Sequence, residues 1–172
     1  MVNQHTLVLG GIRSGKSALA EARAEAAGGA VLYIATATAG DGEMALRIRR
    51  HQERRPEAWG LVEAPLKLAE VMHGQHWNQP PVLLVDCMSL WVSNLLHAGD
   101  DVFQHERAAL LSALADYPGA VIIVSNEVGL GTIGMDPLTR RFCDELGWLN
   151  QDLARHCASV LMSVAGLPLT LK

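Results

Sequence analysis

The sequence has few cysteines and no long apolar run, and each shortage excludes a class of protein. Its 172 residues include three cysteines, Cys87, Cys143 and Cys157, an odd number without a C-x-x-C pair. Neither a disulfide framework nor a cysteine zinc site is therefore predicted. No apolar stretch approaches the roughly 20 residues that cross a bilayer, and the first residues, MVNQHT, lack the basic start of a signal peptide. We expect no membrane span and a cytoplasmic protein.

The sequence also lacks an excess of positive charge and a metal-binding pattern of histidines. The formal net charge is -4 and the isoelectric point is about 5.9, so no basic face for nucleic acid is expected. The seven histidines show neither H-x-x-x-H nor H-E-x-x-H spacing. No structural metal site and no nucleic-acid partner are predicted.

Short apolar runs alternate with stretches of helical spacing along the whole chain. With 172 residues, 49% of them hydrophobic, the chain can bury a core and is predicted to form one domain, 1–172. The apolar runs, interpreted as strands, are 6–10, 30–35, 81–86, 120–125 and 159–164. The stretches with helical spacing are 15–27, 42–54, 65–73, 88–98, 103–116 and 137–157. This order predicts an α/β fold with a mostly parallel sheet flanked by helices on both faces.

Prolines indicate several of the helix boundaries. Pro65 suits the start of helix 65–73, and Pro56 ends the helix before it. Asp136 followed by Pro137 is typical of an N-cap and a first helical residue. Because open α/β sheets bind ligands at the carboxyl ends of their strands, we expect the site at that edge.

The first strand–helix junction contains a complete phosphate-binding motif. Gly10, Gly15, Lys16 and Ser17 fit G-x-x-x-x-G-K-[ST]. Backbone N–H groups of such a loop hold phosphate oxygens, while Lys16 would reach the terminal phosphates and the Ser17 hydroxyl would bind Mg2+. The chain has only three lysines, which argues against a stray surface lysine here. The motif predicts a P-loop NTPase fold of the RecA-like type, whose nucleotide-binding loop comprises Gly10, Gly11, Ile12, Arg13, Ser14, Gly15, Lys16 and Ser17.

A P-loop needs an acidic residue at the tip of another strand to organise Mg2+. The run VLLVD places Asp86 at the end of a fully apolar segment, which suits a Walker B residue and a metal ligand together with Ser17. The alternative is that Asp86 caps the helix that begins near Met88. The two roles can coexist.

The segment GEMALRIRRHQERRP, 42–56, holds five of the eleven arginines and His51. Such density in an acidic protein suggests an anionic partner, although a solvated helix face with pairs such as Glu43 and Arg47 is an equal alternative. Cationic neighbours disfavour the imidazolium and keep His51 neutral near pH 7. A neutral imidazole beside a bound triphosphate can attack phosphorus and form a phosphoramidate.

Several segments together resemble the bifunctional adenosylcobinamide kinase and adenosylcobinamide-phosphate guanylyltransferase family of cobalamin biosynthesis. They are GGIRSGKS, VLYIATA, DGEMALRIRRHQERRP, SLWVSNLL, VSNEVGLG, and NQDLA followed by VAGLPLTLK. They occur in family order over essentially the whole chain. The resemblance implies GTP, ATP and Mg2+ as cofactors. It also implies phosphorylation of adenosylcobinamide, then transfer of GMP from GTP through a guanylylated histidine to adenosylcobinamide phosphate, giving adenosylcobinamide-GDP.

The resemblance also implies roles for individual residues. His51 corresponds by its position to the guanylylated histidine, and Asp86 stands where the family often has Glu. Residues at positions implied to contact nucleotide are Ala35, Thr36, Ala37, Arg54, Arg55 and Glu63. The stretch 35–37 also suits a plain exit from a strand.

Two further segments have open interpretations. Glu127, in VSNEVGLG, is placed to accept the proton of the substrate hydroxyl or to help hold Mg2+, and the alternative is a cap or an ion pair. The four tryptophans could cover a corrin ring but are more often core or subunit contacts, so none is assigned to substrate. The resemblance implies a homotrimer, for which the apolar helix 88–98 is a candidate interface.

Two other functions stay open at this point. One is a single-step P-loop small-molecule kinase in which His51 and its arginines only bind phosphate. The other is a nucleotide-driven switch or ATPase module that acts on a partner. The sequence lacks the N-K-x-D by which switch GTPases read guanine, which argues against the second. A histidine at the labelled position favours guanylyl transfer over the first.

Overall fold

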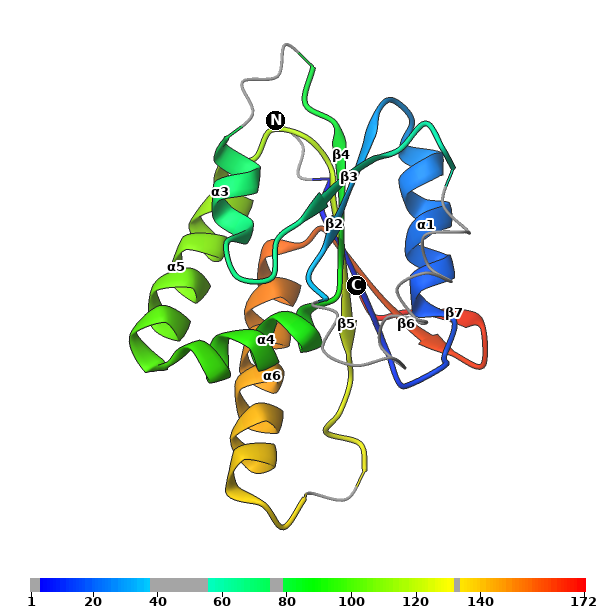
Figure 1. The fold of residues 1–172 in the computed structure, drawn as a ribbon. Helices are drawn as coiled ribbons and strands as arrows, with labels where there is room; N and C mark the ends of the chain where they lie inside the picture. The colour runs from blue at the N-terminus through cyan, green and yellow to red at the C-terminus, as the bar shows by residue number, and fades with distance from the viewer. Residues whose placement is uncertain (1–3, 38–55, 75–78, 132–133) are drawn as a thin grey trace.

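One sheet with helices on both faces forms the protein (Figure 1). A computed structural model describes residues 4–37, 56–74, 79–131 and 134–172. The strands are β1 (Thr6–Gly10), β2 (Val31–Ala35), β3 (Gly60–Glu63), β4 (Val82–Asp86), β5 (Val121–Asn126), β6 (Ser159–Val164) and β7 (Leu167–Thr170). The helices are α1 (Lys16–Ala27), α3 (Leu68–His73), α4 (Met88–Ala98), α5 (Asp100–Asp116) and α6 (Pro137–His156). The expected helix 42–54 lies outside the described residues.

The strand order places the nucleotide loop beside the centre of the sheet. The order is β3-β2-β4-β5-β1-β6-β7, and all neighbouring pairs are parallel except the antiparallel pair of β6 and β7. Parallel strands end at the same edge, so the loops after β1, β4 and β5 meet there. The predicted mostly parallel α/β fold is confirmed.

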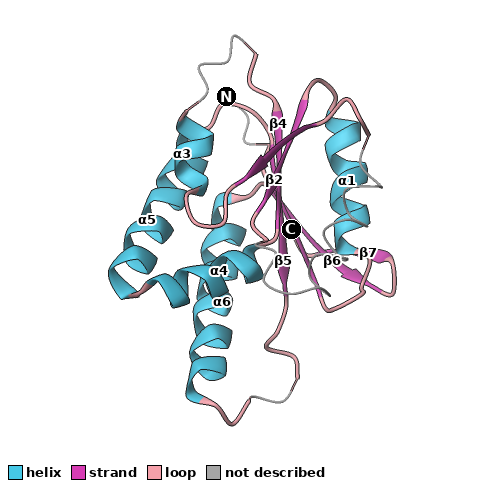
Figure 2. Cartoon of the chain, viewed as in Figure 1, coloured by secondary structure: helices cyan, strands magenta, loops and turns pink. Residues whose placement is uncertain are grey.

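Helices cover the two faces unequally. Helix α1 lies on one face of the sheet, and α3, α4, α5 and α6 lie on the other (Figures 1 and 2). Strand residues alternate between the two cores: Val8 and Val124 face α1, whereas Leu7 and Ile123 face the four helices. This period of two is what buries both faces of a parallel sheet.

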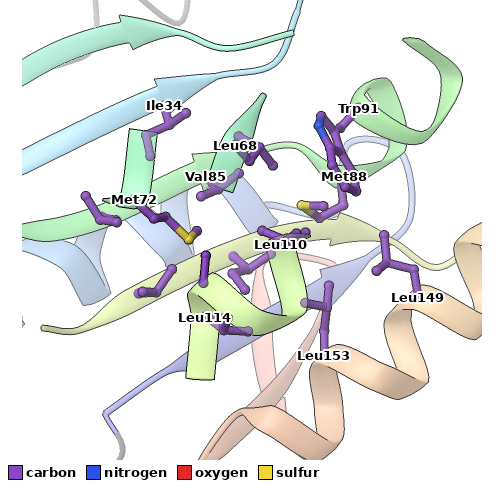
Figure 3. Packing of buried hydrophobic residues seen from close by; sticks show 14 of the residues in the cluster. Ile34, Leu68, Met72, Val85, Met88, Trp91, Leu110, Leu114, Leu149 and Leu153 are labelled. Carbon is purple, nitrogen blue, oxygen red and sulfur yellow. The ribbon is translucent and has the colours of Figure 1, made fainter. Parts of the chain in front are cut away.

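The larger core lies between the sheet and helices α3 to α6 (Figure 3). Leu68 and Met72 of α3 pack there with Leu110 and Leu114 of α5, all at most 4% exposed. Trp91 of α4 is fully buried in the same cluster. The apolar residues of α4 that suggested a subunit interface therefore lie mostly in the core of the chain itself.

The structure confirms most expected elements, adds two strands and corrects the starts of two helices. Strands β3 and β7 were not expected, and α5 begins at Asp100 rather than at 103. Helix α3 begins at Leu68, so the expectation that Pro65 starts it is wrong. The reason is that Asn94 and Trp91 of α4 donate to the carbonyls of Pro65 and Leu66, respectively, so these carbonyls are bonded outside α3.

The predicted start of α6 is confirmed. Asp136 is its N-cap, with Pro137 in the first turn, and the Asp136 carboxylate accepts from the Thr139 N–H at 2.8 Å. That bond lowers the pKa of Asp136.

None of the helices in the described part of the chain is both long and apolar enough to span a membrane.

Candidate active site

The loop between β1 and α1 has the backbone form of a phosphate cradle. Gly15, the N-cap of α1, has φ +93°, and Arg13 has φ +55°. The Ser14 N–H donates to the Gly11 carbonyl at 3.3 Å, which closes a turn. A Cβ added at Gly11 would meet nothing within 4 Å, so this part of the loop faces open space. The loop is therefore curled and accessible from one side.

The first turn of α1 leaves its N–H groups available to an anion. Within the described residues, no side chain caps this helix and its first turn has no acidic residue. The Lys16 ammonium donates to the Gly11 carbonyl at 3.2 Å and so lies across the loop. Unpaired N–H groups, the positive end of the helix dipole and a lysine together suit a phosphate chain.

The hairpin of β6 and β7 supports the loop from the opposite side. The Ser14 carbonyl accepts from the Ser163 hydroxyl at 2.7 Å and from the Gly166 N–H at 2.8 Å. A Cβ on Gly15 would lie 3.0 Å from the Gly166 Cα, and one on Gly10 would lie 2.9 Å from the Ser163 carbonyl oxygen. Both motif glycines thus permit close packing against the hairpin. Sequence reasoning missed these contacts because they join segments about 150 residues apart, although both ends were quoted as separate motifs.

Asp86 lies where a Walker B carboxylate is expected, at the end of β4. Its Oδ2 accepts from the Tyr33 hydroxyl at 3.1 Å, and its position in the strand puts it on the α1 face of the sheet. The N-cap of α4 is Cys87, and no side chain of the described residues caps that helix. The capping alternative for Asp86 is therefore wrong, and Tyr33 is a neighbour that the sequence did not indicate.

The end of β2 is tied to the start of α4. The Thr36 hydroxyl donates to the Cys87 carbonyl at 2.7 Å and accepts from the Cys87 N–H at 2.9 Å. Asn94 donates to the Thr36 carbonyl at 2.8 Å. Thr36 is fully buried, so its side chain serves the fold, whereas Ala35 and Ala37 on either side are partly exposed.

The charges of the P-loop and of β4 act on the same region. Burial raises the pKa of the Cys87 thiol, and the neighbouring Asp86 carboxylate raises it further, while the Lys16 ammonium lowers it. The charges of Lys16 and Asp86 therefore both act on the Cys87 thiol.

The end of β5 lies directly beside the P-loop. The Glu127 N–H donates to the Gly10 carbonyl at 3.1 Å, and the Glu127 carboxylate accepts from the Gly129 N–H at 3.0 Å. The described residues give Glu127 no ion pair, so its present contact is a local loop bond. Asn126 has a buried Oδ1 without a hydrogen-bond partner in the described residues.

The remaining candidates divide into placed and unplaced residues. Glu63 is exposed at the end of β3, where Ala35 pairs with it on one side and with Asp86 on the other. His51, Arg54 and Arg55 lie outside the described residues. The described site thus brings together the P-loop, Ala35, Glu63, Asp86 and Glu127 at one edge of the sheet.

The donors at this edge fit a magnesium ion that is shared with phosphate. Ser17 contributes a hydroxyl oxygen and Asp86 a carboxylate oxygen, the hard ligands that Mg2+ prefers. The described residues contain no group of three or more His, Cys, Asp or Glu that could hold a metal ion by itself. The set therefore suits an ion completed by phosphate oxygens and water.

Comparisons with known proteins find a family and relatives that cover almost the whole chain. The family model described as cobinamide kinase / cobinamide phosphate guanyltransferase matches residues 6–171. The bifunctional adenosylcobalamin biosynthesis protein CobP of Pseudomonas aeruginosa is 51% identical over 167 residues, covering 96% of each chain. The corresponding protein CobU of Escherichia coli is 38% identical over 180 residues, covering 96% of this chain and 98% of the relative.

A solved structure is similar in fold alone. An ATPase from the type III secretion system of pathogenic bacteria has a TM-score of 0.56 and 11% sequence identity. The match covers 97% of this chain and 56% of that chain. It supports the P-loop ATPase architecture and carries no argument about substrate.

Proposed function

The chain belongs to the cobinamide kinase / cobinamide phosphate guanyltransferase family, and we propose that it carries out both reactions with adenosylcobinamide at one nucleotide site. In the first reaction, a nucleoside triphosphate phosphorylates the aminopropanol hydroxyl of adenosylcobinamide. In the second, GMP from GTP passes through His51 to adenosylcobinamide phosphate, which gives adenosylcobinamide-GDP. The family match over residues 6–171 carries this proposal.

The kinase step uses the P-loop and the β5 loop. The substrate hydroxyl oxygen attacks the γ-phosphorus, the bond to the β-phosphate oxygen breaks, and the nucleoside diphosphate leaves. Lys16 and the loop N–H groups hold the β- and γ-phosphates. Glu127, whose backbone bonds Gly10, accepts the hydroxyl proton once its carboxylate exchanges the Gly129 N–H for the substrate.

The guanylyl step needs a nucleophile at the α-phosphorus. A neutral nitrogen of His51 attacks there and pyrophosphate leaves, so the GMP is held in a phosphoramidate. A phosphate oxygen of adenosylcobinamide phosphate then attacks the same phosphorus and releases the histidine. The arginines that surround His51 in the sequence support the neutral imidazole and balance the charge of the phosphates.

Ser17 and Asp86 would hold Mg2+, and Ala35, Thr36, Ala37, Arg54, Arg55 and Glu63 are proposed to surround the nucleotide. For Thr36 the contact would come from the backbone, since its side chain is bonded to Cys87. Bound Mg2+ would neutralise phosphate charge. A homotrimer, which the resemblance implies, and a location in the cytoplasm are also part of the proposal.

Labelling of the protein tests the proposal directly. The protein is incubated with Mg2+ and GTP labelled at either the α- or the γ-phosphate, denatured, and examined for label on the polypeptide. We expect acid-labile, alkali-stable label from α-labelled GTP alone, lost in His51→Ala. The matched control is His105→Ala, which alters an exposed histidine of α5 and should keep the label. Absence of label under conditions where GTP binds would reduce the proposal to a single-step kinase.

A further inference from the structure

We infer that Ser163 is a positioning residue for nucleotide binding: its hydroxyl, together with the Gly166 N–H, orients the Ser14–Gly15 peptide of the P-loop toward the phosphates. Ser163 lies on β6 and contributes no atom to the P-loop motif. The inference rests on nucleotide binding at the P-loop, which is part of the proposed function.

Two donors converge on one carbonyl. The Ser163 hydroxyl and the Gly166 N–H lie 2.7 Å and 2.8 Å from the Ser14 carbonyl oxygen. Both lone pairs of that oxygen are therefore engaged. Ser163 is 1% exposed, so water does not compete for its bond. The carbonyl is held in one direction, toward the hairpin.

The direction of this carbonyl sets the direction of the next N–H. The Ser14–Gly15 peptide is trans, since the only cis peptide among the described residues is Asp86–Cys87. In a planar trans peptide the C=O and the N–H point in opposite directions. Holding the Ser14 carbonyl on the hairpin therefore turns the Gly15 N–H away from it, into the concave side of the loop. That is where a P-loop places its phosphates.

The hairpin is shaped to make this contact. Ala165 and Gly166 have φ +53° and +80°, and they join Val164 to Leu167 in a two-residue turn. A Cβ on Gly15 would stand only 3.0 Å from the Gly166 Cα, so the turn and the loop are in direct contact. Ser163 is in register with Gly10, the first glycine of the motif. The loop is thus fixed before nucleotide arrives, which lowers the cost of binding.

Calorimetric titration with GDP and GTP tests the inference. Ser163→Ala removes one oxygen, and we expect the Kd for both nucleotides to rise about fivefold, the effect of one ordinary hydrogen bond. Ser163→Thr keeps the hydroxyl on a strand that favours β-branched residues and should stay within about twofold of the wild type. Thermal unfolding is recorded for each variant, because a purely structural role would lower the Tm without changing Kd.

The control is Ser159→Ala, at the opposite end of the same strand, which should bind nucleotide as the wild type does. Unchanged affinity in Ser163→Ala would overturn the inference and leave the proposed function intact. Equal losses in Ser163→Thr and Ser163→Ala would also overturn it, because the hydroxyl would then not be the cause. A wild type that binds neither GDP, GTP nor ATP would overturn the proposed function and this inference with it.

Discussion

The Tyr33 hydroxyl of β2 donates to Oδ2 of Asp86 on the neighbouring strand β4, with 3.1 Å between the two oxygens. Tyr33 is 4% exposed and lies in the small core under α1. The bond therefore fixes one oxygen of the proposed metal ligand before a metal binds. Loss of a group that holds a metal ligand in this way typically weakens metal binding by about 10- to 100-fold.

Tyr33→Phe is expected to raise the Mg2+ concentration for half-maximal activity by about tenfold, because the Asp86 carboxylate loses its orienting donor. Activity at saturating Mg2+ should stay near that of the wild type. The measurement is a Mg2+ titration of nucleotide turnover. Tyr117→Phe is the control. It removes a buried hydroxyl that donates to the Pro81 carbonyl at 2.7 Å, at the amino end of β4 and so away from Asp86. Identical Mg2+ curves for both variants would contradict the role of Tyr33.

Lys16→Ala is expected to weaken GTP binding by about 10- to 100-fold, since a charge-assisted contact to phosphate is lost. The Tm should hardly change, because the Lys16 ammonium makes only a 3.2 Å contact with the Gly11 carbonyl. Equilibrium binding and thermal unfolding measure the two effects. Lys67→Ala removes an exposed lysine that pairs with Glu70 and should bind GTP normally. Equal binding by both variants would argue against a phosphate contact of Lys16.

His5 makes the stability of the fold depend on pH. Burial lowers the pKa of His5 below its ordinary value, and nearby His156 lowers it further, against the opposing effect of the Leu114 carbonyl. The unfolded chain therefore binds a proton at a higher pH than the folded one, so stability falls as pH decreases below about 6.5. We expect His5→Gln, which keeps a donor for Leu114, to lose less Tm between pH 7.5 and 5.5. An equal loss in both proteins would assign the acid sensitivity to other groups.

A buried polar network ties β5 to α6. The Ser125 hydroxyl donates to Asn150 Oδ1 at 2.6 Å, and Asn150 Nδ2 donates to the Asn126 carbonyl at 3.1 Å. Asn150→Ala leaves both partners unsatisfied and should lower the free energy of unfolding by about 2–4 kcal/mol. In a double-mutant cycle with Ser125→Ala, urea unfolding should give a coupling energy of about 1 kcal/mol. Strict additivity would mean that the 2.6 Å bond contributes nothing to stability.

The sequence predicted the elements whose own residues carry a strong pattern. Five strands, β1, β2, β4, β5 and β6, were expected because their residues are mostly apolar, as is typical of strands that are buried on both faces. The two missed strands are the outermost strands of the sheet. Strand β3 is mostly exposed, and all residues of β7 are exposed. Since neither strand is buried on a face, its residues do not show the apolar run by which the other strands were predicted. The turn at Ala165 and Gly166 also lacks the Asn-Gly pair that usually indicates a hairpin.

The starts of two helices were misjudged for different reasons, one local and one tertiary. Gly99 both ends α4 and precedes α5, so the second helix begins at Asp100, with Asp101 also in its first turn. Those acidic residues were a usable signal for the start of the helix. Pro65 misled because its carbonyl is bonded by Asn94, a contact that no local pattern reveals.

The candidate site was predictable where one segment contains all the chemistry. The P-loop and Asp86 lie where their motifs indicated. Tyr33 and Ser163 were not predictable, because each acts on a residue at least 50 positions away in the sequence. The roles of His51, Arg54 and Arg55 stay predictions.

The hairpin of β6 and β7 also has a consequence for the order in which the proposed nucleotide site is assembled during synthesis. Strand β1 is made before its two neighbours β5 and β6, and the donors on the Ser14 carbonyl come from Ser163 and Gly166. A nascent chain that has not yet reached these residues contains the whole P-loop motif without its support. We therefore expect nucleotide capture to follow the synthesis of β6 and β7, and a translation product that stops before them to bind nucleotide more weakly than the whole protein does.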